Sequence, residues 1–170
     1  MRKPPLANQV SVKLVLILLG IFIFFNLFIM PSLTGDQKVT PLDLQFAYTP
    51  TEAYELIDTY SDETRKNYVL GEMTKDLAYP VVYTLFMSLL ILLLYPNQWK
   101  LAWFPYSIFI SDLLENTGII TLLLNYPDRL PTIAWMTSVI TTVKWVLVLV
   151  AIIIIINGLR KKFCNKNLSH

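Results

Sequence analysis

Four long apolar runs constrain the fold of this chain more than any other feature of its sequence. They lie at residues 12–30, 76–95, 101–124 and 131–157. An α-helix needs roughly 20 residues, at about 1.5 Å each, to cross the ~30 Å hydrocarbon layer of a bilayer. Strands would need a closed barrel there, and the runs lack the alternation of polar and apolar residues that a barrel wall shows. The sequence therefore predicts an all-α bundle of four transmembrane helices.

Composition agrees with a membrane protein. Hydrophobic residues make up 55% of the 170 residues, which is too apolar for an ordinary soluble domain. The length is that of one domain, so we expect a single membrane domain over residues 1–170. Five prolines lie at or near the edges of the runs, where a missing backbone N–H costs least: Pro31, Pro96, Pro105, Pro127 and Pro131.

The first run could be mistaken for a secretory signal peptide. Its apolar stretch is longer than the roughly 7–15 residues of a signal, and no small-residue cleavage pattern follows Met30. We therefore expect the run to be retained as a membrane anchor.

The distribution of charge predicts the orientation. The N-terminal tail, the loop after the second run and the C-terminal tail together carry eight basic and no acidic side chains, whereas residues 34–75 carry eight acids against four basic residues. Basic loops stay on the cytoplasmic side. Both termini are therefore expected in the cytoplasm and residues 34–75 outside it.

Residues 34–75 read as a helical extracytoplasmic cap. Thr49, Pro50 and Glu52 have the spacing of a capping box with proline at the first helical position, and Ser61 is a second cap. From Asp62 a polar helix is expected to run into the second span. The first cap helix has an apolar face that would rest on the bundle or on the membrane surface: Ala53, Tyr54, Leu56, Ile57 and Tyr60. The cap either shields the bundle or forms a lid over a site.

Ionisable residues within the third and fourth runs give the strongest functional signal. Asp112, Glu115 and Asn116 share one face of the third helix at offsets of three and four. Two carboxylates should not face lipid, because each costs ~2.5–3.5 kcal/mol at the bilayer centre. Lys144 of the fourth run lies at a similar depth to Asp112, with Thr141 one turn away. One lysine cannot neutralise two acids, so one acid is expected to keep its proton.

The second run adds a polar stripe at its outer end. Asp76, Tyr79 and Tyr83 repeat at offsets of three and seven, and Glu72 lies one turn earlier. Pro80 also leaves the backbone carbonyl of Asp76 without its usual helical donor. We expect these side chains to join the cluster in an acidic pocket that opens toward the outer leaflet. The opposing interpretation is a structural Asp112–Lys144 pair whose polar neighbours fix helix packing.

Several classes of site and partner are excluded. Cys164 is the only cysteine and His170, the last residue, the only histidine, so no disulfide, thiol relay, histidine-based triad or histidine-ligated zinc site is expected. We expect no metal and no cofactor. A net charge of +2 argues against nucleic acid binding. Expected partners are the lipid bilayer, a lipid or small-molecule ligand, and a second copy or another membrane protein.

Three short motifs carry a resemblance to a family. The sequence reads DLAYPVVY at the start of the second span, DLLEN within the third and VKW in the fourth. In these motifs the chain, from Leu42 onward, resembles a family of small four-span bacterial membrane proteins of uncharacterised function. The resemblance implies a four-helix fold and a bacterial inner membrane, and it implies no activity.

Three functions remain open at this point. The first is an intramembrane ligand-binding or catalytic site, in which Asp112 or Glu115 exchanges a proton or binds a cationic or hydroxylated ligand. The second is proton or cation translocation, which for four helices would require an oligomer. The third is an accessory subunit whose ions only fix helix packing. Whether the protein is an enzyme is left undecided.

Overall fold

The computed structural model describes residues 11–29 and 40–167, and within them it contains helices and no strands. The predicted end of the first span at Met30 and residues 34–39 of the cap lie outside the described residues. The helices are α1 (Val12–Phe24), continued by the π-helical segment η2 (Phe25–Ile29), then the short 3-10 helix η4 (Leu42–Leu44), α2 (Pro50–Asp58), α3 (Asp62–Leu94), the 3-10 helix η5 (Trp99–Trp103), α4 (Pro105–Leu124) and α5 (Pro131–Asn167).

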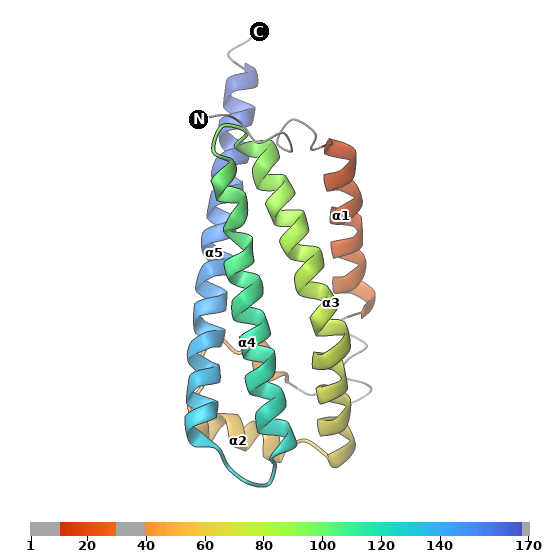
Figure 1. Ribbon diagram of the computed structural model, residues 1–170, viewed down its shortest axis with the longest axis vertical. Helices are drawn as coiled ribbons and strands as arrows, with labels where there is room; N and C mark the ends of the chain where they lie inside the picture. Colours follow the sequence, from red (N-terminus) through yellow and green to blue (C-terminus); the bar gives the residue numbers. More distant parts are fainter. Residues whose placement is uncertain (1–10, 30–39, 168–170) are drawn as a thin grey trace.

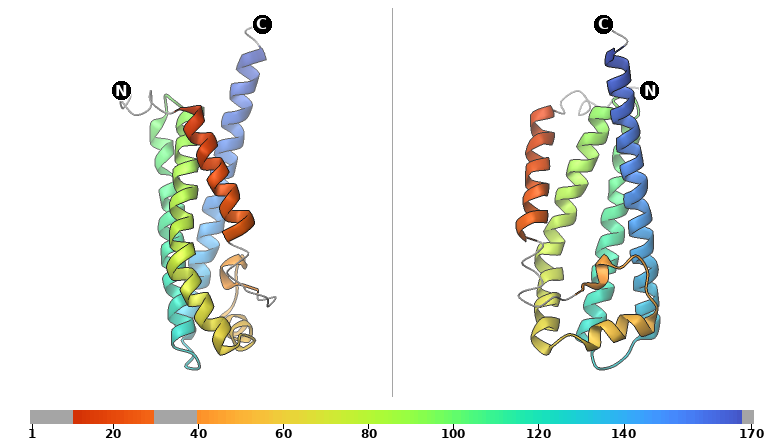
Figure 2. Two further views of the ribbon diagram at one scale, coloured as in Figure 1. Left: turned by 90° about the vertical axis from the view of Figure 1, so that its right-hand side faces the viewer. Right: turned by 180° about the vertical axis from the view of Figure 1, so that it is seen from behind.

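Four of these segments are long and apolar enough to cross a membrane: α1 with η2, α3, η5 with α4, and α5. The predicted four-helix membrane fold is thus confirmed. In the bundle, α4 lies between α3 and α5, and α1 packs against the outer side of α3 (Figure 1). The start of α1 and the end of α5 lie at one end of the bundle, and α2 lies across the other (Figures 1 and 2). We call this second end the capped end.

Two helices are longer than the apolar runs that predicted them. The helix α3 contains the second span and begins at Asp62, as predicted, because the Ser61 side chain accepts a hydrogen bond from the Thr64 N–H and caps the helix there. Glycine lowers the stability of a helix, but α3 continues without interruption through Gly71. The last helix, α5, continues to Asn167 rather than ending at residue 157. At about 1.5 Å per residue its length exceeds the ~30 Å hydrocarbon layer, so its final turns project beyond the bundle (Figure 1).

The cap helix α2 starts at the predicted capping box. Thr49 Oγ1 accepts from the Glu52 N–H (3.2 Å), and Glu52 Oε2 accepts from the Thr49 N–H (2.7 Å). The hydrogen bonds from Thr49 lower the pKa of Glu52 below its usual value. Four of the five residues of the predicted apolar face are buried, and they pack against apolar residues at the capped ends of α4 and α5: Ile119, Leu122, Leu123 and Ala134. The cap therefore rests on the bundle.

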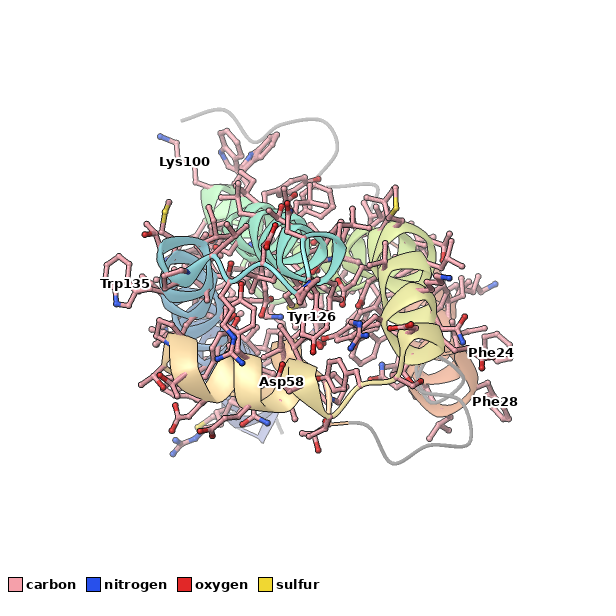
Figure 3. All side chains as sticks on the ribbon, turned by 90° about the horizontal axis from the view of Figure 1, so that it is seen from below. Phe24, Phe28, Asp58, Lys100, Tyr126 and Trp135 are labelled. Carbon is pink, nitrogen blue, oxygen red and sulfur yellow. The ribbon has the colours of Figure 1, made fainter. Side chains whose placement is uncertain are left out.

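Contacts with the α4–α5 turn fix the position of α2. Tyr54 is buried, and its hydroxyl accepts from the Leu130 N–H (2.6 Å). Arg129 in the same turn donates to Asp58 at the end of α2 (2.9 Å). Seen from the capped end, α2 lies beside the ends of α4 and α5 (Figure 3).

The outer surface of the bundle is apolar. Phe24, Phe28 and Trp135 are exposed and point away from the bundle (Figure 3). Buried polar and charged side chains, by contrast, come from α3, α4 and α5 and face inward, as expected of a protein whose solvent is hydrocarbon.

Candidate functional site

The predicted cluster of buried ions forms between α4 and α5. Lys144 Nζ of α5 lies 3.2 Å from Asp112 Oδ1 and forms a second ion pair with Glu115 Oε2. The lysine reaches both acids because they lie one helical turn apart on α4. Residue exposure is 8% for Asp112, 0% for Glu115 and 8% for Lys144. We call these three residues the ion triad.

The ion triad is held by close contact between α4 and α5. The Thr141 hydroxyl donates to Glu115 Oε1 (2.7 Å), so one oxygen of this acid binds a lysine and the other a threonine. One turn along α4, a Cβ built on Gly118 would lie 2.1 Å from Thr137 Oγ1 and 3.0 Å from Thr137 Cβ. Only glycine permits this separation, which brings the acids of α4 within reach of Lys144.

Asn116 links α4 to α3. Its Nδ2 donates to the backbone carbonyl of Asp76 (3.3 Å), which is the carbonyl that Pro80 deprives of its helical donor. Both residues of this contact, Asn116 and Asp76, are buried. A side chain of the neighbouring helix thus replaces the hydrogen bond that proline removes from α3.

Replacing Asn116 by leucine should lower the free energy of unfolding by about 1–3 kcal/mol, because the Asp76 carbonyl is then buried without a donor. In a Pro80→Ala background the same change should cost less, since an alanine at this position supplies the helical N–H. Denaturant unfolding of the four proteins of this double-mutant cycle, in one detergent, measures the difference. The exposed Asn97→Leu serves as control. Equal costs of Asn116→Leu in both backgrounds would contradict the proposed replacement.

Three carboxylates gather closer to the capped end. Asp43, Glu72 and Asp76 each offer one carboxylate oxygen, and these three atoms lie within 4.8 Å of one another. We call these residues the carboxylate trio. The helical spacing of Glu72 and Asp76 predicted that they share a face, and both are buried. Asp43 was not a predicted site residue.

Asp43 belongs to a chain segment that runs alongside α5. Between η4 and α2, the Tyr48 N–H donates to Ser138 Oγ (2.9 Å) and the Phe46 carbonyl accepts from Thr142 (3.0 Å). The Asp43 carbonyl accepts from Trp145 Nε1 (3.3 Å). Successive turns of α5 thus bind successive positions of the segment. The last of these contacts, between Trp145 and Asp43, lies next to Lys144 in the sequence of α5.

Asp43 is also held from α3. The Tyr68 hydroxyl donates to Asp43 Oδ1 (2.8 Å) and accepts from the Leu42 N–H (2.9 Å). Tyr48, in the segment between η4 and α2, is buried, and burial raises the pKa of its phenol to about 12. Tyr48 therefore keeps its proton at physiological pH and remains a hydrogen-bond donor.

The trio lacks the partners that the ion triad has. Among the described side chains, no lysine or arginine forms a salt bridge with Asp43, Glu72 or Asp76. Glu72 is 2% exposed, and within the described structure neither of its carboxylate oxygens has a hydrogen-bond partner. Comparisons with family models, with curated proteins and with solved structures found no match. The chemistry of the trio and the triad is therefore the basis for assigning a function.

Tyr79 and Tyr83 differ in position although the sequence places them in one stripe. The Tyr79 hydroxyl donates to Asn26 Oδ1 (3.1 Å), and its ring stacks on Phe22 and Phe25, so this tyrosine faces α1 and η2 rather than the acids. Tyr83 is buried inside the bundle. Of the two tyrosines, only Tyr83 belongs to the interior.

Polar groups continue along α3 away from the capped end. Glu72, Asp76, Thr84 and Ser88 recur at multiples of four residues, and because one turn takes 3.6 residues they form a polar face that winds gradually around the helix. All four are buried. Neither hydroxyl, of Thr84 or of Ser88, has a hydrogen-bond partner in the described structure. This polar face of α3 was not predicted, because single Thr and Ser residues are common in membrane helices.

Proposed function

We propose that the protein binds positive charge, as protons or as a cationic ligand, at the buried carboxyl groups near its capped end. The observation that carries the proposal is a charge imbalance: four buried acids and the half-buried Asp43 make up the triad and the trio, and one described lysine pairs with two of the five. Buried carboxylates without counter-charge are strongly disfavoured. Protons or a cation must therefore accompany the remaining acids.

The triad and the trio have different roles in this proposal. Lys144 contacts both Asp112 and Glu115, which suits an ion-paired link between two helices. The carboxylates of the trio take no part in this link. Asp43, Glu72 and Asp76 have no described cationic partner, so they are the groups at which an external proton or cation would bind.

The side of the membrane from which the ligand arrives follows from the charge distribution. The described basic residues at the start of α1, in η5 and at the end of α5 lie at the uncapped end, and the described acids of η4, α2 and the first turns of α3 lie toward the capped end. We propose that the capped end faces the outside of a bacterial inner membrane. The ligand would then reach the trio from the extracytoplasmic side.

A hydrophobic carbodiimide tests the proposal, because it reacts with protonated carboxyl groups in apolar surroundings and not with the anions. In the purified protein we expect an adduct on Glu72 or Asp76, located by mass spectrometry of the digested chain. Labelling should decrease as pH rises, because the carboxyl groups lose their protons. It should also decrease when added cations compete for the same groups. Glu72→Gln combined with Asp76→Asn should abolish it, whereas Glu55→Gln on the exposed side of α2 should not. Absence of any adduct on the trio, with no effect of cations on stability, would contradict the proposal.

The polar face of α3 favours proton translocation as a second candidate. It carries polar groups from the trio toward the uncapped end, through Thr84 and Ser88. The same carbodiimide-treated protein in liposomes distinguishes the two functions. Proton entry that the adduct blocks identifies translocation, and labelling without proton entry identifies a binding site.

A further inference from the structure

We infer that Asp43, Glu72 and Asp76 form a binding site for a hard divalent cation, and that Ca²⁺ is the ion expected to occupy it. The inference rests on the proposed function and names its ligand. It also revises the expectation of no metal, which considered cysteine and histidine ligands and did not include Asp43.

The spacing of the three oxygens carries the first step. One carboxylate oxygen of each residue lies within 4.8 Å of the other two. Calcium binds oxygen at roughly 2.3–2.6 Å, so two ligands on opposite sides of the ion stand about 4.8 Å apart. A single Ca²⁺ can therefore contact all three residues. Magnesium demands nearly octahedral geometry and gives up its water reluctantly, so it is less suited than Ca²⁺ to three ligands held by separate parts of the chain.

Glu72 supplies the second, independent observation. It is 2% exposed, and neither of its oxygens has a hydrogen-bond partner among the described residues. A buried carboxyl group without donors is unusual, because removing it from water costs several kcal/mol unless another group compensates. A cation bound between Glu72 and the neighbouring oxygens of Asp43 and Asp76 compensates directly.

The ligand atoms and the charge select the class of ion. All three side chains are carboxylates, which favour Ca²⁺, Mg²⁺ and Mn²⁺ over the zinc and copper that prefer sulfur and imidazole. Three ionised carboxylates leave one negative charge around a divalent ion and two around a monovalent ion. In surroundings of low dielectric the divalent ion is therefore favoured.

The three ligands are held by separate parts of the fold. Glu72 and Asp76 lie one turn apart on α3, whereas Asp43 is fixed by the hydroxyl of Tyr68 and by Trp145 of α5. Tyr68 donates to one oxygen of Asp43, and the second oxygen remains for an ion. The site is therefore formed before the ion binds, which reduces the ordering cost of binding.

Terbium luminescence tests the site, because Tb³⁺ replaces Ca²⁺ on oxygen ligands and emits when a nearby indole absorbs light. The Trp145 indole donates to the Asp43 backbone, so it can sensitise an ion held by Asp43. In lipid-free detergent we expect emission that saturates with Tb³⁺, is displaced by Ca²⁺ at lower concentration than by Mg²⁺, and is unaffected by equimolar K⁺. Glu72→Gln should weaken Tb³⁺ affinity by at least about tenfold, since even outer-shell partners of a metal change affinity that much.

Two further measurements keep the result interpretable. Asp43→Asn, which lies outside α3, should weaken affinity as Glu72→Gln does, and the exposed Glu55→Gln should not. In the unmodified chain, Ca²⁺ should also protect Glu72 from carbodiimide, which requires no variant. Terbium emission that persists in Glu72→Gln and Asp43→Asn would overturn the metal site.

The carbodiimide result separates the two proposals. If carbodiimide still labels the trio without protection by Ca²⁺, the metal inference fails and the proposed function stands. If labelling is absent as well, both fail.

Discussion

Replacing Lys144 by methionine is expected to lower the free energy of unfolding by about 3–5 kcal/mol, the cost of removing one partner from a buried ion pair. Lys144 contacts two acids, Asp112 and Glu115, which are 8% and 0% exposed. Methionine has similar length and no charge, so both carboxylates would remain in the bundle without a cation. Reversible unfolding by a denaturing detergent, followed by tryptophan fluorescence, measures the loss.

The matched control removes all three charges together. Lys144→Met combined with Asp112→Asn and Glu115→Gln should recover most of the stability, because replacing a complete buried ion network by neutral groups of similar shape is often close to neutral. Lys162→Met, near the end of α5 and exposed, should leave stability unchanged. If Lys144→Met unfolds like the original chain, the two acids carry protons and the ion triad contributes little.

The second large effect is expected at the capped end. Tyr54→Ala should lower stability by about 3–5 kcal/mol, the usual cost of truncating a buried aromatic side chain. Tyr54 is 2% exposed and packs with Ile57 of α2 over the ends of α4 and α5. The loss should also release α2, so its amide hydrogens should exchange faster with solvent than those of α4.

Two variants separate packing from hydrogen bonding in this helix. Tyr54→Phe keeps the ring and leaves the Leu130 N–H without its acceptor, so about 1–3 kcal/mol should be lost. Glu55→Ala changes an exposed neighbour and should have little effect. If Tyr54→Ala is no more costly than Tyr54→Phe, the ring does not hold the cap on the bundle.

The sequence predicts the parts of this molecule that depend on regular spacing. Four apolar runs predict four spans, because the bilayer demands a minimum helix length. The offset between Asp112 and Glu115 predicts a shared face, and antiparallel neighbours joined by a short turn bring Lys144 to the same depth. The capping box predicts the first residue of α2 because the side-chain hydrogen bonds involve residues only three apart.

The parts that the sequence does not predict depend on tertiary contacts. Asp43 enters the site on a segment without helical or strand periodicity, and its depth is set by hydrogen bonds to α5. Tyr79 shares a stripe with Tyr83, but an offset of four residues leaves enough angular difference for Tyr79 to meet α1 instead. The sequence also predicts that the acids face an open pocket, a prediction that remains without a test, whereas Glu72 and Glu115 are almost fully buried.

The location of the three charges on two different helices has a consequence for biogenesis. Asp112 and Glu115 leave the ribosome before Lys144, so the third span reaches the membrane with two acids and no lysine beside them. Each uncompensated acid opposes partitioning into lipid by ~2.5–3.5 kcal/mol. Only the hairpin of α4 and α5 brings the opposite charges together. In the second half of the chain, we therefore expect the α4–α5 hairpin, rather than either helix alone, to be the unit that inserts stably into the bilayer.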